Sequence, residues 1–187
     1  RVAFDCASSI ETEARAERWY PCNKGGEFRK WYGNNNFIVD WEGAGLRIKN
    51  LFDGDGKLRS RPQNEKFYFK PGLTWSAISI SSLSMRLSPK GAMFETKGAM
   101  CFPSSEDMHD VLAFANTKIV NRLLLALSPT LDFHEGPVGR LPVKLADGAG
   151  ALAQRCVELA RLDWDGYETS WDFTSLRLLS SDHGAET

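Results

Sequence analysis

Residues 104–127, SSEDMHDVLAFANTKIVNRLLLAL, decide the fold class, because here the spacing of apolar residues changes to that of a helix. Ser104 with Asp107 resembles the start of a capping box, and Pro129 follows the end of the run. The apolar side chains that recur at helical spacing are Leu112, Ala115, Ile119, Leu123 and Ala126. The pattern predicts one amphipathic helix with a single buried stripe.

The residues before this helix are typical of short strands, rich in β-branched and aromatic side chains between glycine- and proline-bearing turns. In the longest of these segments Ile78 and Ile80 share one face, and we expect the helix to pack there. Strands are predicted at residues 37–41, 67–69, 74–87, 92–96 and 98–102, short helices at 8–17 and 43–50, and a polar loop at 52–62.

A loop held by two prolines is expected at 130–143, and a second helix at 149–162. The rest, 163–187, is expected to be extended. The fold class is therefore α+β, with a strand-rich N-terminal two-thirds followed by two helices. The side chains expected to face inward from the second helix are Leu152, Cys156, Leu159 and Ala160.

The bulk composition is that of a soluble globular domain. Of 187 residues, 42% are hydrophobic and 25% charged, which suits one domain with one core. No apolar run is long enough to span a bilayer, and the start has no signal-peptide pattern. The chain begins with Arg1, as an excised fragment would. Its four cysteines form no C-x-x-C pair, which favours a cytoplasmic location over a disulfide framework.

Residues 18–36, RWYPCNKGGEFRKWYGNNN, combine four cations with five aromatic side chains and three glycines. Cations neutralise phosphates, aromatic rings stack, and glycine lets backbone approach a ligand closely. The pattern therefore fits nucleic-acid binding. It equally fits a strand-rich domain whose aromatic residues fill the core.

The charge distribution is uneven, although the net charge is only −1. Residues 57–70 hold five cations and one acid, whereas the chain turns acidic from Glu158 onward. Such asymmetry indicates either a polyanion contact on one face or a patchy solvated surface.

No catalytic or metal-binding constellation is present in the sequence. The three histidines are isolated, and Asp53-Gly-Asp55-Gly-Lys57 departs from a calcium loop at several positions, so we interpret it as a turn. Gly43-Ala44-Gly45 lacks the third glycine of a dinucleotide-binding loop. Walker and nucleophile-elbow motifs are also missing.

Residues 19–34, WYPCNKGGEFRKWYGN, followed by Val39 and Trp41, resemble the large adenine-specific DNA methyltransferases of the phage-growth-limitation and BREX phage-defence systems. The resemblance covers most of the chain. It continues through 61–69 (RPQNEKFYF), 72–76 (GLTWS), 89–91 (PKG), Asn121, 129–133 (PTLDF) and 163–173 (DWDGYETSWDF). The matched region of that family resembles a target-recognition domain, related to the C-terminal specificity domain of Taq-type methyltransferases.

The resemblance implies a parent enzyme that flips an adenine out of the duplex and methylates its N6 with S-adenosylmethionine. The family's Asn-Pro-Pro-Tyr motif and glycine-rich cofactor loop do not occur here. We therefore expect this chain to be non-catalytic, to hold no cofactor and to grip double-stranded DNA. Residues 1–145 are expected to be the DNA target-recognition domain, and 146–187 a helix and linker to the next region. The implied partners are the parent's catalytic domain and other defence proteins, with no membrane contact.

Roles on DNA follow from side-chain chemistry. Lysines act as point charges, so we expect Lys24 and Lys66 to hold phosphates. Arginine and asparagine make bidentate contacts to base edges. The expected readers are Arg29, Asn35, Arg61 and Asn64, and the remaining expected contacts are Lys30, Tyr32 and Arg59. The cations expected to share one exposed face are Lys24, Arg29, Lys30, Arg59 and Arg61.

Two other classes of function remain open. One is an interaction module that docks other defence proteins and contacts DNA little, for which the basic and aromatic segments would be buried or scattered. The other is an enzyme with an unrecognised nuclease site, which a divalent-metal cleavage assay would detect.

Overall fold

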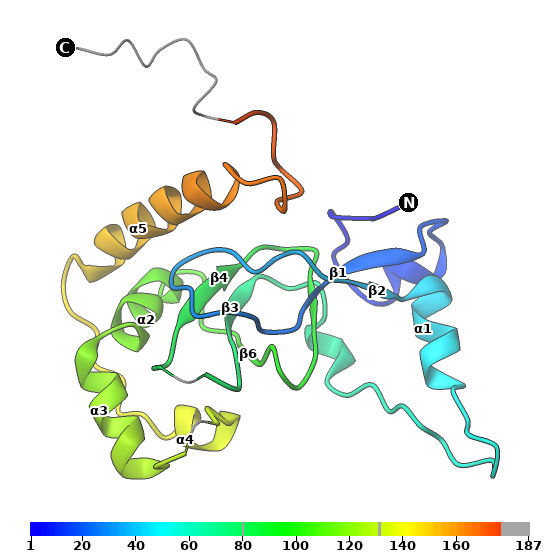
Figure 1. Ribbon diagram of the computed structural model, residues 1–187, viewed down its shortest axis with the longest axis horizontal. Helices are drawn as coiled ribbons and strands as arrows, with labels where there is room; N and C mark the ends of the chain where they lie inside the picture. The colour runs from blue at the N-terminus through cyan, green and yellow to red at the C-terminus, as the bar shows by residue number, and fades with distance from the viewer. Residues whose placement is uncertain (80, 131, 177–187) are drawn as a thin grey trace.

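The computed structural model describes residues 1–79, 81–130 and 132–176. Two small sheets lie beside one another, and four helices of the second half gather around one of them (Figure 1). This arrangement confirms the α+β class, with the strands in the first two-thirds of the chain, α1 among them, and the other four helices after the strands.

The first sheet has β1 (Trp19–Asn23) at its centre. β2 (Ile38–Asp40) pairs with β1 antiparallel, and β5 (Met93–Phe94) pairs with it parallel on the other edge. Helix α1 (Glu42–Lys49) follows β2, and a 3-10 turn, η1 (Glu11–Glu13), contacts it. The expected helix at 8–17 is therefore reduced to one short turn.

The second sheet is antiparallel throughout. β3 (Gly72–Trp75) lies between β4 (Met85–Ser88) and β6 (Met100–Cys101). The helices beside it are α2 (Met108–Ala115), α3 (Lys118–Leu127), α4 (Glu135–Gly139) and α5 (Ala149–Trp164).

Each sheet has its own hydrophobic cluster. The cluster of the first sheet includes Tyr20, Trp41 and Phe69. The rings of Tyr20 and Phe69 pack edge-on, with their centroids 5.5 Å apart. The second cluster joins β3, β4, α2, α3 and α5. Its most buried members include Leu73, Leu83, Leu112, Val120 and Leu124. The single core expected from chain length is thus divided into two.

The strand predicted at 74–87 is wrong in its extent. β3 ends at Trp75 and β4 begins at Met85, with a loop between them. Ile78 is 52% exposed there and is not a member of the core cluster that holds the helices, and Ile80 lies outside the described residues. The residues predicted as a strand at 67–69 overlap a 3-10 turn, η2 (Glu65–Phe67), since Asn64 before it adopts the left-handed conformation with φ 60°.

The helix predicted at 104–127 is interrupted at Asn116 and Thr117. The Thr117 hydroxyl accepts from the Val120 N–H at 3.3 Å and so caps the second helix, α3. The break shifts the buried positions of α3 to Val120 and Leu124, whereas Ile119, expected inside, is 65% exposed. Two further members of the predicted stripe differ as well: Leu123 is half-buried and Ala126 is exposed.

The predicted inward face of α5 is wrong in part: Cys156 and Ala160 are half-buried, and Ala160 packs against the core, but the two leucines do not face inward. Leu152 and Leu159 are exposed, while Ala153, Val157 and Trp164 are buried, one position further along the helix. α5 packs mainly on α2, which small residues allow. The Gly150 N–H donates to Asp110 Oδ1 at 2.7 Å, and a Cβ on Gly150 would meet the same carboxylate. The boundary expected between 145 and 146 stays a prediction.

The remaining expectations are met to different degrees. Residues 52–62 form a loop, confirmed as a turn by the Gly56 N–H donating to the Asp53 carbonyl at 3.0 Å. α4 interrupts the loop expected at 130–143. The chain after α5 continues through turns up to residue 172 and then has no regular structure up to 176, and the rest of the predicted extended tail lies outside the described residues.

Candidate nucleic-acid interface

Residues 24–36 leave the end of β1 as a long loop that returns to β2. Gly25 and Gly26 have φ angles of +82° and +134°, a conformation that glycine adopts readily and other residues rarely. Lys24 is exposed at the start of the loop, and its Nζ lies 5.3 Å from the centre of the Phe37 ring. Lys24 makes no ion pair with any residue that the structure describes.

The next two cations of the loop bond to the helical part of the chain. Arg29 Nη1 forms an ion pair with Asp163 Oδ2 at 2.9 Å, and its guanidinium lies 5.1 Å from the ring centre of Trp164. Lys30 Nζ donates to the Asn116 carbonyl at 2.8 Å, and burial lowers the pKa of its ammonium. Neither side chain is free to meet a phosphate without giving up these contacts.

Tyr32 and Asn35 also face the helical part. Tyr32 is 5% exposed, with the Arg161 guanidinium 5.4 Å from its ring centre, and burial raises the pKa of its hydroxyl. The Asn35 carbonyl accepts from Trp171 Nε1 at 2.8 Å. The loop residues 29–35 therefore join the strands to α5 and to the segment after it.

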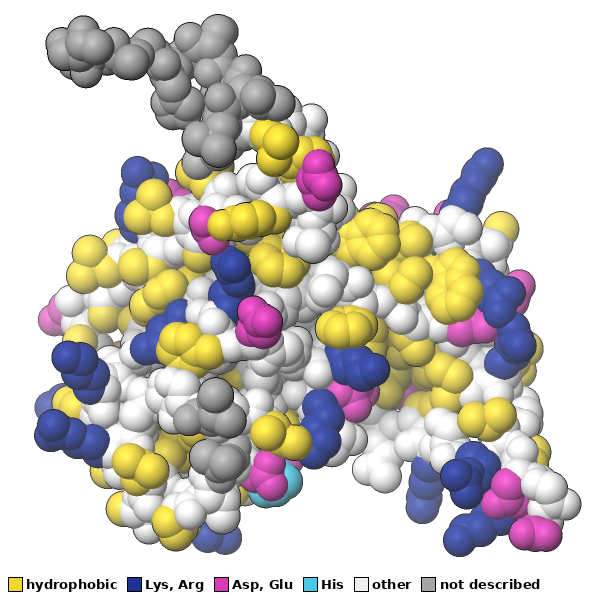
Figure 2. All heavy atoms as spheres, viewed as in Figure 1, with side chains coloured by type: hydrophobic (Ala, Val, Ile, Leu, Met, Phe, Trp, Pro, Cys, Tyr) yellow, Lys and Arg dark blue, Asp and Glu magenta, His cyan; other side chains and the backbone are white. Residues whose placement is uncertain are grey.

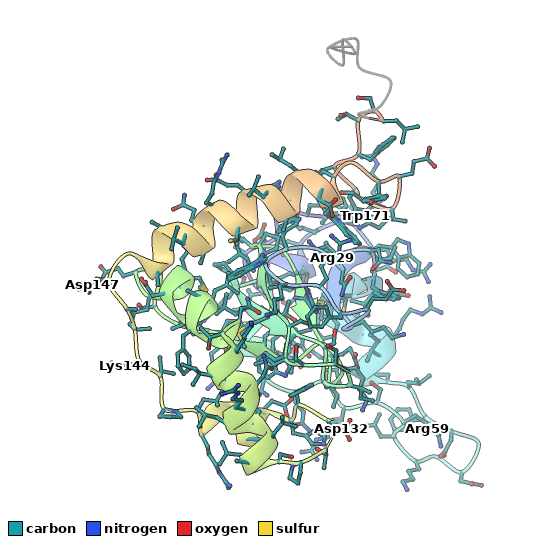
Figure 3. The ribbon with its side chains drawn as sticks, turned by 60° about the vertical axis from the view of Figure 1, so that its left-hand side comes forward. Arg29, Arg59, Asp132, Lys144, Asp147 and Trp171 are labelled. Carbon is teal, nitrogen blue, oxygen red and sulfur yellow. The ribbon has the colours of Figure 1, made fainter. Side chains whose placement is uncertain are left out.

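The expectation that five cations share one exposed face is wrong, because Arg29 and Lys30 are bonded to the helical part of the chain. Figure 3 shows Arg29 near Trp171 and Arg59 apart from it, on a loop that projects from the body of the molecule. Arg59 also lies 3.8 Å from Asp53 Oδ2, in an exposed pair that contributes little. Of the five, Lys24 and Arg61 are exposed and have no carboxylate partner within the described part of the chain.

Arg61 and Asn64 line a groove of about 670 Å³. Its other side is formed by β5 and by the turn at Glu95 and Thr96, with Trp41, Tyr68 and Phe94 also among its lining residues. Two predicted readers thus share one groove with aromatic side chains. Glu95 and Glu135, which also line it, make its charge mixed rather than purely positive.

The turn beside this groove connects it to the glycine loop. The Glu95 N–H donates to the Asn23 carbonyl at 3.2 Å. A Cβ on Gly25 would lie 2.6 Å from the Lys97 carbonyl oxygen, so the two turns are in close contact. Lys24, Lys97, Arg61 and Asn64 are all exposed on these neighbouring segments. We call the groove, together with these four exposed residues on the segments beside it, the groove surface.

The loop at 51–59 projects from the body of the molecule (Figure 1). Phe52 and Leu58 form an isolated antiparallel bridge, and the Asp53 carboxylate accepts from the Lys57 N–H at 2.8 Å. Figure 2 shows Lys and Arg side chains together with acidic ones on this loop. Lys66, the last predicted contact, is exposed, and its Nζ lies 5.1 Å from the ring centre of Phe67.

Sequence reasoning missed three residues that shape this region: Ser76, Arg86 and Lys97. Arg86 is a charged residue inside the predicted strand SMRLS, which is a readable signal for a buried polar contact. Ser76 and Lys97 lie in turns whose partners come from distant parts of the sequence. Their contacts could be found only from the fold.

The described residues carry no group of three or more potential metal ligands. Burial raises the pKa of Cys22 in the groove to about 12, so its thiol is uncharged and a poor nucleophile at neutral pH. A Cβ on Gly45 would lie 2.5 Å from the Trp41 ring, so the ring packs directly against the Gly45 backbone.

Two curated proteins match nearly the whole chain. The adenine-specific methyltransferase PglX of Lacticaseibacillus casei (strain Zhang) is 38% identical over 187 aligned residues, covering 96% of this chain. The adenine-specific methyltransferase BrxX of Escherichia coli O9:H4 (strain HS) is 34% identical over 165 residues, covering 87%. The chain spans only 16% and 13% of the length of these relatives. No family model matches the chain.

In the described residues no helix combines the length and the apolarity that crossing a membrane requires.

Proposed function

We propose that this chain is the DNA target-recognition segment of an adenine-specific DNA methyltransferase of a phage-defence system. The parent enzyme transfers a methyl group from S-adenosylmethionine to N6 of an adenine, and this segment holds the duplex in the cytoplasm while a separate catalytic domain does the chemistry. The likeness to two adenine-specific methyltransferases supports the family, and the groove surface supports the role.

The observation that carries the proposal is the placement of Arg61 and Asn64 together in one groove. Arginine pairs with guanine and asparagine with adenine through two hydrogen bonds each, and both side chains are exposed here. Lys24 and Lys66 are exposed for phosphate contacts. Arg29 and Tyr32 serve instead to fix the loop against α5, Lys30 bonds to Asn116 between α2 and α3, and Asn35 bonds to Trp171 after α5. Arg59 stays a proposed contact on the projecting loop.

A segment exchange tests the proposal. The matching segment of a related methyltransferase with a different methylation site replaces residues 1–176 in the full-length enzyme, and the methylated adenines are mapped across a genome. If the segment recognises the target, the site moves with it. A hybrid that is active and keeps the host's original site would contradict the proposal. The reciprocal hybrid controls for misfolding.

Exposed leucines favour a second candidate function, a protein-docking module. On α5, Leu152, Leu159 and Leu162 are 72%, 53% and 49% exposed, and they lie on the side opposite the buried residues. Unpartnered apolar side chains of this kind suit packing against another protein surface. In this account the module binds the catalytic domain or other defence proteins. The double substitution Leu152→Glu and Leu159→Glu would then break the association with the partner. The DNA affinity of the enzyme, measured without other defence proteins, would stay unchanged.

A further inference from the structure

Side chains donate hydrogen bonds to three backbone carbonyl groups of the loop at 25–29. Ser76 Oγ donates to the Gly26 carbonyl at 3.0 Å, and Asn34 Nδ2 donates to the Glu27 carbonyl at 2.9 Å. Arg86 Nη1 donates to the Arg29 carbonyl at 3.2 Å, and Arg86 Nη2 donates to Ser76 Oγ at 3.4 Å. Three backbone carbonyl groups of the loop, those of Gly26, Glu27 and Arg29, therefore each accept a hydrogen bond from a side chain.

The N–H groups of the same loop have no such partners. Within the part of the chain that the structure describes, no oxygen accepts from the backbone N–H of residues 25–29. Gly26, Glu27 and Phe28 are exposed, whereas Gly25 is buried and Arg29 half-buried, so the middle of the run lies at the surface where a ligand can reach it. A run of unpaired backbone N–H groups in a glycine turn carries partial positive charge and attracts anions.

A buried cation lies under this run. Arg86 is 1% exposed, no carboxylate in the described residues pairs with it, and its Nε has no partner there. Burial, with a further contribution from the charge of Arg29, lowers the pKa of its guanidinium to about 10. A guanidinium that is buried without a counter-charge raises the positive potential above it. The exposed cations Lys24 and Lys97 lie at the edge of the same turn.

We propose that Gly25–Phe28 is an anion-binding loop that takes one backbone phosphate of double-stranded DNA, with Ser76 and Arg86 holding its carbonyls inward so that its N–H groups face the ligand. This inference rests on the proposed DNA-recognition function and adds a phosphate site that involves no exposed basic side chain as its principal donor. The exposed carboxylate of Glu27 opposes the phosphate and sets the site's modest strength.

The test compares Ser76→Ala with Ser84→Ala in the full-length enzyme. Both serines are buried, but Ser84 Oγ has no hydrogen-bond partner among the described residues, so its loss leaves the loop unchanged. Neither change alters charge. We expect Ser76→Ala to weaken DNA binding by roughly 2- to 12-fold on recognised and random duplexes alike. This is the effect of losing the net free energy of about one hydrogen bond, the one that orients the loop. The slope of log affinity against log salt should fall by up to about 0.9. Ser84→Ala should bind as the parent does.

A second variant keeps the test valid if Ser76→Ala folds poorly, which thermal unfolding reports. Glu27→Gln removes an exposed acid and should tighten binding to every duplex, whereas Glu168→Gln, an exposed acid after α5, should not. Unchanged affinity in a folded Ser76→Ala or in Glu27→Gln overturns the loop inference. A loss confined to the recognised site does so as well, because phosphates carry no sequence. If Lys24→Ala and Arg61→Ala also leave DNA affinity unchanged, the proposed function itself fails.

Discussion

Asn116 shows how a single side chain joins the two halves of this molecule. Its Oδ1 accepts from the Met85 N–H at 3.0 Å and its Nδ2 donates to the Met85 carbonyl at 2.9 Å, as a neighbouring strand would. Its own carbonyl accepts from Lys30. Asn116, at the break between α2 and α3, therefore hydrogen-bonds the backbone of Met85 at the start of β4. It also connects the loop after β1 to the helices.

Asn116→Ala should lower the free energy of unfolding by about 1–3 kcal/mol, since the buried Met85 N–H loses its acceptor. The Met85 carbonyl keeps the Trp31 N–H as a donor at 2.9 Å. Urea denaturation followed by circular dichroism measures this. Asn36→Ala, at an exposed position of the preceding loop, is the control and should stay within about 0.5 kcal/mol. An equal effect of the two substitutions would contradict the role given to Asn116.

At the scale of elements, the helices within 104–127 and 149–164 lie where apolar spacing places them, but the buried faces of α3 and α5 differ from the predicted ones. The helical pattern crosses Asn116 and Thr117 without interruption, so periodicity alone merges α2 with α3 and selects Ile119 and Leu123. The cause of the break is the pairing of Asn116 with Met85, which is distant in sequence. In a run as apolar as Leu123-Leu124-Leu125, only tertiary contacts decide which leucine is inside.

Adjacent leucines of α3 test this assignment. Leu124→Ala should cost about 2–5 kcal/mol, because Leu124 is 2% exposed in the core. Leu125→Ala removes the same atoms from a side chain that is 66% exposed and should cost under about 0.5 kcal/mol. Thermal or chemical unfolding of the two variants is sufficient. A larger loss for Leu125 would mean that the register of α3 is wrong.

The candidate site was predictable in part. Exposed cations in glycine-bearing loops were readable, as Lys24, Arg61 and Lys66 show. The internal use of Arg29 was not, because its partner Asp163 lies in the acidic part of the chain, which composition presented as a separate solvated segment. Cations of the N-terminal part and acids of the C-terminal part therefore neutralise each other in part, as the ion pair of Arg29 with Asp163 shows.

At the scale of the whole molecule, two small cores share one chain, and the loop at 24–36 runs between them. One end of this loop contacts the groove surface, and the other is fixed to α5 through Arg29 and Tyr32. A duplex held at the groove surface would therefore be coupled mechanically to the helices. This arrangement fits a segment that positions DNA for a catalytic domain elsewhere in the parent enzyme.

This chain on its own should not bind S-adenosylmethionine or methylate DNA, since the Asn-Pro-Pro-Tyr motif and the glycine-rich cofactor loop of the methyltransferases it resembles do not occur in it. Isothermal titration calorimetry of the chain with the cofactor should give no heat of binding. The full-length enzyme under the same conditions is the positive control. Saturable binding to the isolated chain would refute this division of roles.

The most direct measurement compares DNA affinity of Arg61→Ala and Lys24→Ala in the full-length enzyme, on recognised and random duplexes over a range of salt concentrations. Arg61→Ala should cost about 1–3 kcal/mol on the recognised site and much less on random DNA. Lys24→Ala should weaken both duplexes alike and reduce the salt slope by about one. Equal losses for both variants on every duplex would contradict the assignment of reader and phosphate contact. No loss in either would contradict DNA recognition by the groove surface and favour the docking module.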